Sequence, residues 1–415
     1  MRIVLTFILV ISGFLILGQT QRALFLGNSY TNVNSLPQLT ADVASSAGDT
    51  LVFDSNTPGG YTLEGHSTNT VSLEKIMQGK WDFVVLQEQS QRPSFPINQV
   101  MEDVFPYARI LDSIINAYNP CGETMFYMTW GRKNGDVTNC PNWPPVCTYE
   151  GMDSLLHLRY MMMADSNNAV VSPVGAVWKF IRENHPEIEL YSADESHPSS
   201  AGSYAAACSF YTAIFRKDPE LITYDFTLNP MDAANIRAAA KQMVFDSLLH
   251  WHIGEYDLFS DFSYSQISGY TYQFLNQSLN SIGQHWDFGT ATDTSANPAY
   301  TFPEQGTYSV QLASFNYCDT IVSSKEIVVV STNILENNFF DDFFVYPNPA
   351  QDILSLNRAA SAEVSVNIYN LFGEIVMTYE NLEVNEIHIG LLRKGLYYLT
   401  VELGGKIITR KFIKN

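Results

Sequence analysis

The feature that most constrains the fold is a regular alternation of strand-like and helix-like segments between Arg22 and Glu255. Short apolar runs are typical of buried strands, and longer stretches with helical character separate them. The strand candidates are RALFLG, TLVFDS, DFVVLQ, TMFYMT and AVVSPV, and the helix candidates include LPQLTADVASSAG, SLLHLRYMMMAD and the segment from Phe105 to Ala117. This alternation predicts an α/β three-layer sandwich, in which helices cover both faces of a mostly parallel sheet.

The remainder of the chain has an all-β pattern. After about Tyr256, segments such as TYSVQLASF and KEIVVVS alternate between apolar and polar residues with period two. We therefore expect an α/β domain at 21–255, a β-sandwich at 257–331, a polar linker at 332–342 and a second β-sandwich module at 343–415.

The N-terminus and the overall charge indicate an exported protein. Arg2 precedes an apolar run from Ile3 to Leu17 that is short for a membrane span, so residues 1–20 are expected to form a signal peptide, with a retained anchor as the alternative. The sequence has 43 acidic and 23 basic residues, a formal net charge of −20. Such a charge disfavours binding to nucleic acid or to an anionic membrane surface.

Export allows disulfides among the five cysteines. Cys140 and Cys147 bracket the loop NCPNWPPVC, which has little else to hold it, and we expect them to be bonded to each other. Cys208 lies in a helical run of small residues and is expected to be a buried thiol, with a bond to Cys121 as the alternative. No spacing of cysteine and histidine predicts a zinc site.

Ligands of an open parallel sheet bind beyond the carboxyl ends of the strands, so the residues that follow each strand candidate are the first candidates for a site. The first strand is followed by GNSYT at 27–31, which places the hydroxyl of Ser29 on a tight turn before a helix. Asn and Ser also favour turns and helix caps for local reasons, so this segment is weak evidence alone.

The next two strand ends offer hydrogen-bond donors. PGGY at 58–61 would let a backbone N–H approach a substrate, although it is also an ordinary glycine turn. QEQS at 87–90 offers side-chain amides. TWGR at 129–132 follows the fourth strand and would either line a pocket or pack in the interior.

The most informative segment is DESHPS at 194–199, which precedes a helix of small residues. A serine hydroxyl becomes a good nucleophile when an imidazole removes its proton, and a carboxylate holds that imidazole in the required tautomer. Asp194 and His197 supply both groups from one loop. A capping aspartate with a surface histidine is the alternative interpretation.

GNSYT resembles the nucleophile block of SGNH (GDSL-like) hydrolases, and DESHPS resembles their D-x-x-H block. The resemblance covers about residues 22–255 and implies a flavodoxin-like fold, with Ser29 as nucleophile, His197 as base and Asp194 as its partner. It further implies an oxyanion hole that is built from the amides of Ser29 and Gly60, or Gly59 in its place.

The third block departs from the family pattern. The family usually has G-x-N-D, whose Asn is an oxyanion donor, where this chain has QEQS. Gln87 is expected to take that role, with Gln89 as the alternative. Asn28, Gln89, Trp130 and Arg132 are expected to line a substrate pocket, and the apparatus needs no metal or cofactor.

Three other histidines are weaker candidates. His66 lies in a turn-rich segment without a locally paired carboxylate. His250 and His252 form an H-x-H pair that would suit a metal, but no further ligands accompany it, and the end of a helix near the domain boundary explains both.

Both β modules carry family motifs. QHWDFG at 284–289 and GTYSV at 306–310 resemble a PKD domain, an immunoglobulin-like sandwich that would act as a spacer or bind glycans. VYPNP at 345–349, GLYY at 395–398 and the terminal KIITRKFIKN resemble the C-terminal sorting domain of the type IX secretion system of Bacteroidetes, with a further adhesive β-sandwich as the alternative. The type IX resemblance implies that the secretion machinery is a partner and that the chain is secreted or held at the cell surface.

These features together predict a secreted serine esterase, with a carbohydrate acetylesterase acting on an acylated carbohydrate, or on another small ester, as the expected kind. A non-catalytic cell-surface adhesin or glycan-binding protein on a degenerate hydrolase scaffold is the alternative, and the altered QEQS block is the best argument for it.

Overall fold

The computed structural model describes residues 18–330, 344–357, 364–371, 373–382, 385–403 and 406–415. The expected signal peptide, apart from residues 18–20, and the expected linker lie outside these residues. The chain divides into two compact units, Met1–Ser331 and Thr332–Asn415. The first unit contains two separate hydrophobic cores, one in the α/β domain and one in the first β-sandwich.

The α/β domain is built on a five-stranded sheet in the order β2-β1-β3-β4-β5, and every neighbouring pair is parallel. The strands have the bounds β1 Thr20–Leu26, β2 Thr50–Asn56, β3 Phe83–Leu86, β4 Glu123–Tyr127 and β5 Val170–Ser172. All five predicted strands are present. Strands β3 and β5 and most of β1 and β4 are buried on both faces, which explains their continuous apolar runs.

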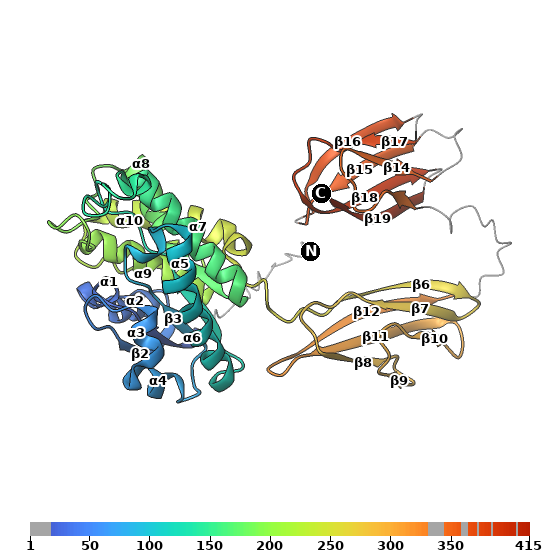
Figure 1. Ribbon diagram of the computed structural model, residues 1–415. Helices are drawn as coiled ribbons and strands as arrows, with labels where there is room; N and C mark the ends of the chain where they lie inside the picture. The colour runs from blue at the N-terminus through green and yellow to red at the C-terminus, as the bar shows by residue number, and fades with distance from the viewer. Residues whose placement is uncertain (1–17, 331–343, 358–363, 372, 383–384, 404–405) are drawn as a thin grey trace, which may run out of the picture. The chain divides into compact units, whose positions relative to one another are not determined.

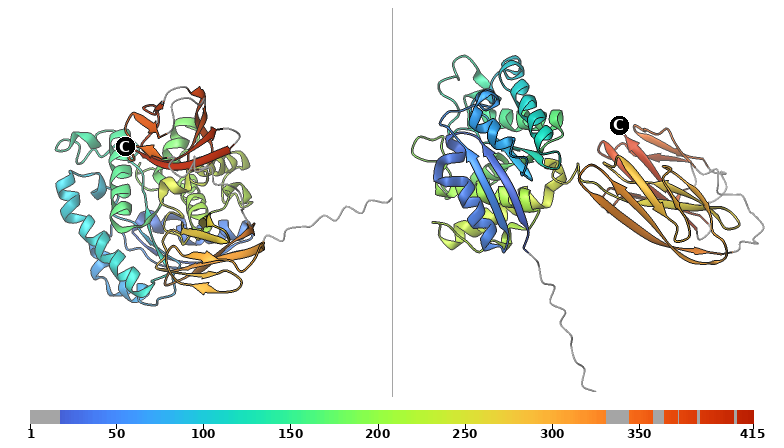
Figure 2. Two further views of the ribbon diagram at one scale, coloured as in Figure 1. Left: turned by 90° about the vertical axis from the view of Figure 1, so that its right-hand side faces the viewer. Right: turned by 90° about the horizontal axis from the view of Figure 1, so that it is seen from below.

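Helices cover both faces of this sheet (Figures 1 and 2). Helices α2 and α9 contact each other on one face, with α8 and α10 beside α9, and helices α4, α6 and α7 are in contact on the other. The α-helices are α1 Ser29–Asn32, α2 Leu36–Ser46, α3 Leu63–Thr68, α4 Thr70–Ile76, α5 Ile97–Asp103, α6 Phe105–Tyr118, α7 Tyr149–Asn167, α8 Val174–Asn184, α9 Ser200–Phe215 and α10 Pro230–Met243. Five short 3₁₀ segments accompany them: η1 Val33–Ser35, η2 Arg92–Ser94, η3 Pro144–Val146, η4 Pro219–Leu221 and η5 Phe245–Trp251. The predicted three-layer α/β fold is confirmed.

The first β-sandwich pairs a three-stranded sheet, β10-β7-β6, with a four-stranded sheet, β12-β11-β8-β9. Trp286 is fully buried in the core of this sandwich, and its Nε1 donates to Ser295 O at 3.0 Å. The strands are β6 Phe262–Ser268, β7 Thr271–Asn276, β8 Gly283–Asp287, β9 Thr292–Asp293, β10 Ala299–Thr301, β11 Gly306–Phe315 and β12 Thr320–Val329.

The second compact unit is a further antiparallel β-sandwich with its own core, made of sheets β13-β14-β17 and β16-β15-β18-β19. Its strands are β13 Val345–Tyr346, β14 Ile353–Leu356, β15 Val364–Tyr369, β16 Ile375–Leu382, β17 Glu386–His388, β18 Gly395–Leu403 and β19 Lys406–Lys414. The two predicted all-β modules are therefore present.

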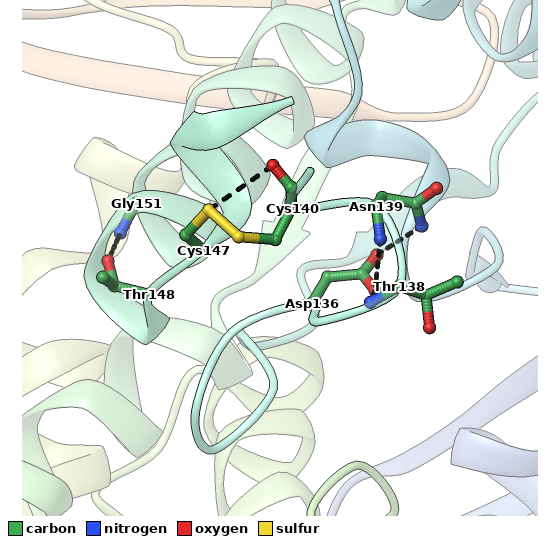
Figure 3. Close-up of a disulfide and its surroundings, with 7 residues drawn as sticks. All are labelled: Asp136, Thr138, Asn139, Cys140, Cys147, Thr148 and Gly151. Atoms are coloured by element: carbon green, nitrogen blue, oxygen red, sulfur yellow. Dashed lines mark hydrogen bonds between the residues drawn. A yellow bond between two sulfur atoms is a disulfide. The ribbon is translucent and has the colours of Figure 1, made fainter. Parts of the chain in front are cut away.

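The structure has two disulfides. Cys140 and Cys147 are bonded, as predicted, and close the loop before α7 (Figure 3). Cys121 is bonded to Cys318, across 197 residues, and so joins the turn before β4 to the β11–β12 hairpin. Cys208 is a buried free thiol, and the alternative that paired it with Cys121 is wrong.

Candidate active site

Ser29 is the first residue of α1 and follows the tight turn after β1, at the carboxyl edge of the sheet. Gly27 makes this turn possible, because a Cβ there would lie 2.4 Å from Thr31 Oγ1 and 2.6 Å from Gln87 Oε1. Asn28 caps α1, and its side-chain oxygen accepts a hydrogen bond from the first turn of the helix at 3.1 Å. These contacts fix the serine in a tight turn between a central strand and a helix.

Ser29, His197 and Asp194 form a continuous hydrogen-bonded chain. The Ser29 hydroxyl lies 2.8 Å from His197 Nε2, and His197 Nδ1 lies 2.5 Å from Asp194 Oδ2. The other Asp194 oxygen accepts the backbone N–H groups of Ser196 at 3.1 Å and His197 at 3.0 Å. Partial burial on its own would raise the pKa of Asp194, but hydrogen bonds from the His197 ring and these N–H groups hold the pKa below its ordinary value. An ionised Asp194 favours the tautomer with hydrogen on Nδ1, which leaves Nε2 free to accept the serine proton.

An aromatic stack supports the loop that carries His197. Trp130 stacks between Tyr30, at 4.8 Å, and Trp178, at 3.7 Å, as measured between ring centroids. Trp130 Nε1 donates to Ser196 O at 3.1 Å, and the Tyr30 hydroxyl lies 2.6 Å from Ser196 Oγ. Trp130 is completely buried. The prediction that Trp130 lines the pocket is therefore corrected: the ring packs beneath the loop.

Two other predicted pocket residues have different surroundings. Asn28 is buried, and its Nδ2 donates to Tyr61 O at 2.9 Å, which ties the β2–α3 loop to the nucleophile turn. It does not face solvent, so the prediction that it lines a pocket is corrected as well. The Arg132 side chain is one-quarter exposed, and its guanidinium lies 3.5 Å from Asp136.

The predicted backbone donors of the oxyanion hole are the N–H groups of Ser29 and Gly60. Within the part of the chain that the structure describes, neither the Ser29 N–H nor the Gly60 N–H has a hydrogen-bond acceptor. Gly60 has φ +68°, a left-handed conformation that favours glycine, in a turn closed by Tyr61 N donating to Pro58 O at 3.2 Å. Gly59 lies in the same turn and stays an alternative.

Gln87 is fully buried beneath the nucleophile turn. Its Oε1 accepts from the Asn28 N–H and from the Thr31 hydroxyl, both at 2.9 Å. Its Nε2 donates to Glu88 O at 2.5 Å. Gln87 thus stabilises the nucleophile turn from its buried side. This placement does not favour the predicted role of its side-chain amide as an oxyanion donor.

Gln89 is the more exposed of the two amides. It is only partly buried, and its Oε1 accepts from the N–H groups of Gln91 at 2.9 Å and Arg92 at 3.2 Å. Its Nε2 donates once, to Gln91 Oε1 at 3.1 Å, so among the described residues the second N–H has no partner.

His66 has no contact with Ser29, but it supports the same turn. The ring is buried, with Nε2 2.9 Å from Gly27 O and Nδ1 2.7 Å from Ser72 Oγ. Burial lowers the pKa of His66 to about 4, although the bond to Gly27 O opposes the shift. The ring is therefore neutral at ordinary pH, donates to Gly27 O and accepts from Ser72.

The H-x-H pair lies at the end of the α/β domain. His252 follows η5 with φ +60° and pairs with Glu255, whereas the ring of His250 packs against Trp251 at 4.4 Å. Across the described ranges, no group of three or more His, Cys, Asp or Glu side chains is arranged to hold a metal ion.

Sequence reasoning missed two buried supports of the site, Tyr30 and Glu88, and it weighed His66 among the weaker histidine candidates and not as a support of the turn. Tyr30 and Glu88 stand directly beside the predicted functional residues in the chain, which is the one signal that pointed to them. Their roles depend on tertiary contacts with Ser196 and Leu63 that the sequence does not reveal.

A comparison with known protein families identifies the last module. Residues 344–415 match the family model described as the secretion system C-terminal sorting domain. The domain marks the chain for export by the type IX secretion system, to the cell surface or into the medium. No helix among the described residues is both long and apolar enough to cross a bilayer. No curated protein matches the chain.

Solved structures resemble the first unit. A DUF4886 family protein from Bacteroides uniformis is 18% identical, with a TM-score of 0.47, over 56% of this chain and 95% of its own. A protein from Slackia heliotrinireducens assigned to the SGNH hydrolases is 24% identical, with a TM-score of 0.39, over 46% of this chain and 97% of its own. The PKD1 domain of a Vibrio cholerae metalloprotease is 27% identical, with a TM-score of 0.17, over 17% of this chain and 95% of its own.

The parallel sheet with helices on both faces defines the first domain as a three-layer α/β domain, with Ser29 at the carboxyl edge of its sheet. In the exported chain this domain precedes two antiparallel β-sandwiches, the second of which is a type IX sorting domain.

Proposed function

We propose that the chain is a secreted serine esterase in which Ser29 attacks the ester carbonyl. The observation that carries this proposal is the unbroken chain from Ser29 Oγ through the His197 ring to Asp194, at 2.8 and 2.5 Å. His197 Nε2 takes the serine proton as the new C–O bond forms, and the imidazolium then returns that proton to the leaving alcohol. Water, deprotonated by the same ring, cleaves the acyl-enzyme and regenerates Ser29.

The oxyanion that develops in both steps would be stabilised by the N–H groups of Ser29 and Gly60 and by the Gln89 side-chain amide. One such donor contributes about 2.7–4 kcal/mol to transition-state stabilisation. The free N–H groups described above support this set.

The substrate that we propose is an acetylated carbohydrate. The His197 side chain is one-third exposed and that of Asp194 half exposed, so the reacting groups lie at an open surface that a bulky glycan can approach. The cavity of about 500 Å³ that includes Met128, Phe180 and Trp251 does not include Ser29, so it supplies no apolar tunnel for a long acyl chain at the serine.

Hydrolysis of 4-nitrophenyl acetate and of acetylated xylan by the intact chain tests this proposal. Ser29→Ala and His197→Ala should each reduce kcat by at least about 10³-fold. Ser166→Ala and His185→Ala replace residues of the same types away from the site and should leave the rate unchanged. Equal rates in all variants would refute the esterase and favour a non-catalytic glycan-binding role.

A further inference from the structure

Glu88 lies between the two loops that carry the proposed oxyanion donors, and its side chain is completely buried. One carboxyl oxygen accepts from the Gln89 N–H at 2.5 Å, and the other accepts from the Leu63 N–H at 3.2 Å. Leu63 begins α3, three residues after Gly60. The carboxyl group of Glu88 therefore links the loop that carries Gly60 to the segment that carries Gln89 through two hydrogen bonds.

The charged and titratable groups that face Glu88 come from three elements. Tyr160 of α7 accepts from the Glu88 N–H at 3.3 Å. Arg92 of η2 and Glu64 of α3 act on the carboxyl with opposite signs, and they form an ion pair with each other at 3.2 Å. Among the described residues, no cation forms an ion pair with Glu88 itself.

The protonation state of Glu88 decides how many N–H groups the side chain can hold. A carboxylate has two acceptor oxygens, one for each loop, whereas a protonated carboxyl has one hydroxyl, which is a poorer acceptor. Burial without a counter-ion raises the pKa of Glu88 to about 7, so both states are populated near neutrality.

We propose that Glu88 is a positioning residue whose ionised carboxylate sets the distance between the Gly60 N–H and the Gln89 amide, so that full turnover requires the ionised form. This inference rests on the proposed esterase function. On protonation one of the two N–H groups loses its acceptor, the two loops separate, and the oxyanion is held less well.

The test is the pH dependence of kcat for 4-nitrophenyl acetate between pH 5 and 9, with the intact wild type and Glu88→Gln. Protonation of Glu88 should steepen the wild-type acid limb in a plot of log kcat against pH by up to about one unit of slope. Glu88→Gln should lack this added steepness, because its amide does not titrate. The amide that replaces the carboxylate has one acceptor oxygen, and its NH₂ group opposes the other backbone N–H. For this reason kcat at pH 8 should fall by roughly tenfold or more, whereas KM should change by less than about threefold.

Glu102→Gln is the matched control, since Glu102 is exposed on α5 and should leave both the slope and kcat unchanged. The melting temperature separates positioning from folding. The variant Glu88→Gln removes a buried charge, so at pH 8 its Tm should equal or exceed that of the wild type.

A wild-type acid limb with no downward bend near the pKa of Glu88, at about pH 7, overturns the inference, whether or not the variant folds. An unchanged kcat and slope in Glu88→Gln overturns it as well. In either case inactivity of Ser29→Ala would show that the esterase proposal survives, whereas full activity of Ser29→Ala would refute the proposed function itself.

Discussion

His66 should make the stability of the α/β domain depend on pH. The buried ring donates to Gly27 O and accepts from Ser72, and its pKa is lowered to about 4. A histidine in the unfolded chain has a pKa of about 6.5. As pH falls from about 6.5 to 4, the unfolded chain therefore binds a proton that the folded chain does not. The contribution is fully present above pH 6.5 and lost on the way to pH 4, and a difference of about 2.5 units corresponds to about 3 kcal/mol.

The assay compares the free energy of unfolding of the wild type with that of His66→Gln at pH 8 and pH 4. The glutamine amide can still donate to Gly27 O but does not titrate. Tryptophan fluorescence is a suitable probe, because five of the six tryptophans lie in residues 21–255. The wild-type advantage should shrink by about 3 kcal/mol between the two pH values.

His185→Gln is the control, since His185 is partly exposed at the end of α8. The difference in free energy of unfolding between this variant and the wild type should change little between pH 8 and pH 4. A difference between wild type and His66→Gln that stays constant from pH 8 to pH 4 would refute the reasoning, because it would mean that the folded ring titrates like the unfolded one.

Two further outcomes are expected. Gln89→Ala should reduce kcat by about 10²–10³-fold and leave Tm unchanged. Gln87→Ala should lower Tm, because it leaves the buried Asn28 N–H without an acceptor. Kinetic constants and thermal scans of both variants check this, and the reverse pattern would restore Gln87 as the donor. Joint replacement of Cys121 and Cys318 by Ser should lower the free energy of unfolding by about 2–4 kcal/mol and leave kcat unchanged. Denaturant titration measures the first quantity and ester hydrolysis the second. Unchanged stability would contradict the structural role of the bond.

The layout of the site follows from local sequence rules. Parallel strands end at one edge of the sheet, so the residues after β1, β2 and β3 were expected together, and the short spacing of Asp194 and His197 made their contact predictable. The Cys140–Cys147 bond was predictable for the same reason, because the loop that it closes is short.

The remaining features depend on contacts that periodicity does not encode. Gln87 and Gln89 have the same chemistry and lie two residues apart, and only the packing of the nucleophile turn decides which amide is buried. The bond between Cys121 and Cys318 joins two domains, so no local pattern predicts it. Trp130 was ambiguous because a strand-end aromatic residue can face either a pocket or the core.

Glu88 and His66 lie beneath one site, and burial shifts their pKa values in opposite directions. The pKa of Glu88 is raised to about 7 from an ordinary value of 4.5, so its neutral form favours folding below about pH 4.5, and about 3 kcal/mol of stability is lost as pH rises to 7. His66 loses a similar amount as pH falls from 6.5 to 4. The two contributions nearly cancel between pH 4.5 and 6.5, so together these two groups add almost no net pH dependence to the stability in that range.

Single substitutions should expose each contribution separately. Over pH 4.5–6.5, Glu88→Gln should lose stability relative to the wild type as pH falls, because the contribution of His66 is no longer offset by that of Glu88. His66→Gln should lose stability relative to the wild type as pH rises, because the contribution of Glu88 is then the one left without an offset. The double variant should have nearly the wild-type profile, since neither group remains. Parallel profiles in all four proteins, measured by denaturant unfolding, would mean that these groups are not the source of any pH dependence. A neutral Glu88 would thus be the more stable state of the fold, whereas the ionised state serves the proposed reaction. Holding the N–H groups of Gln89 and Leu63 requires the charge whose burial the fold disfavours.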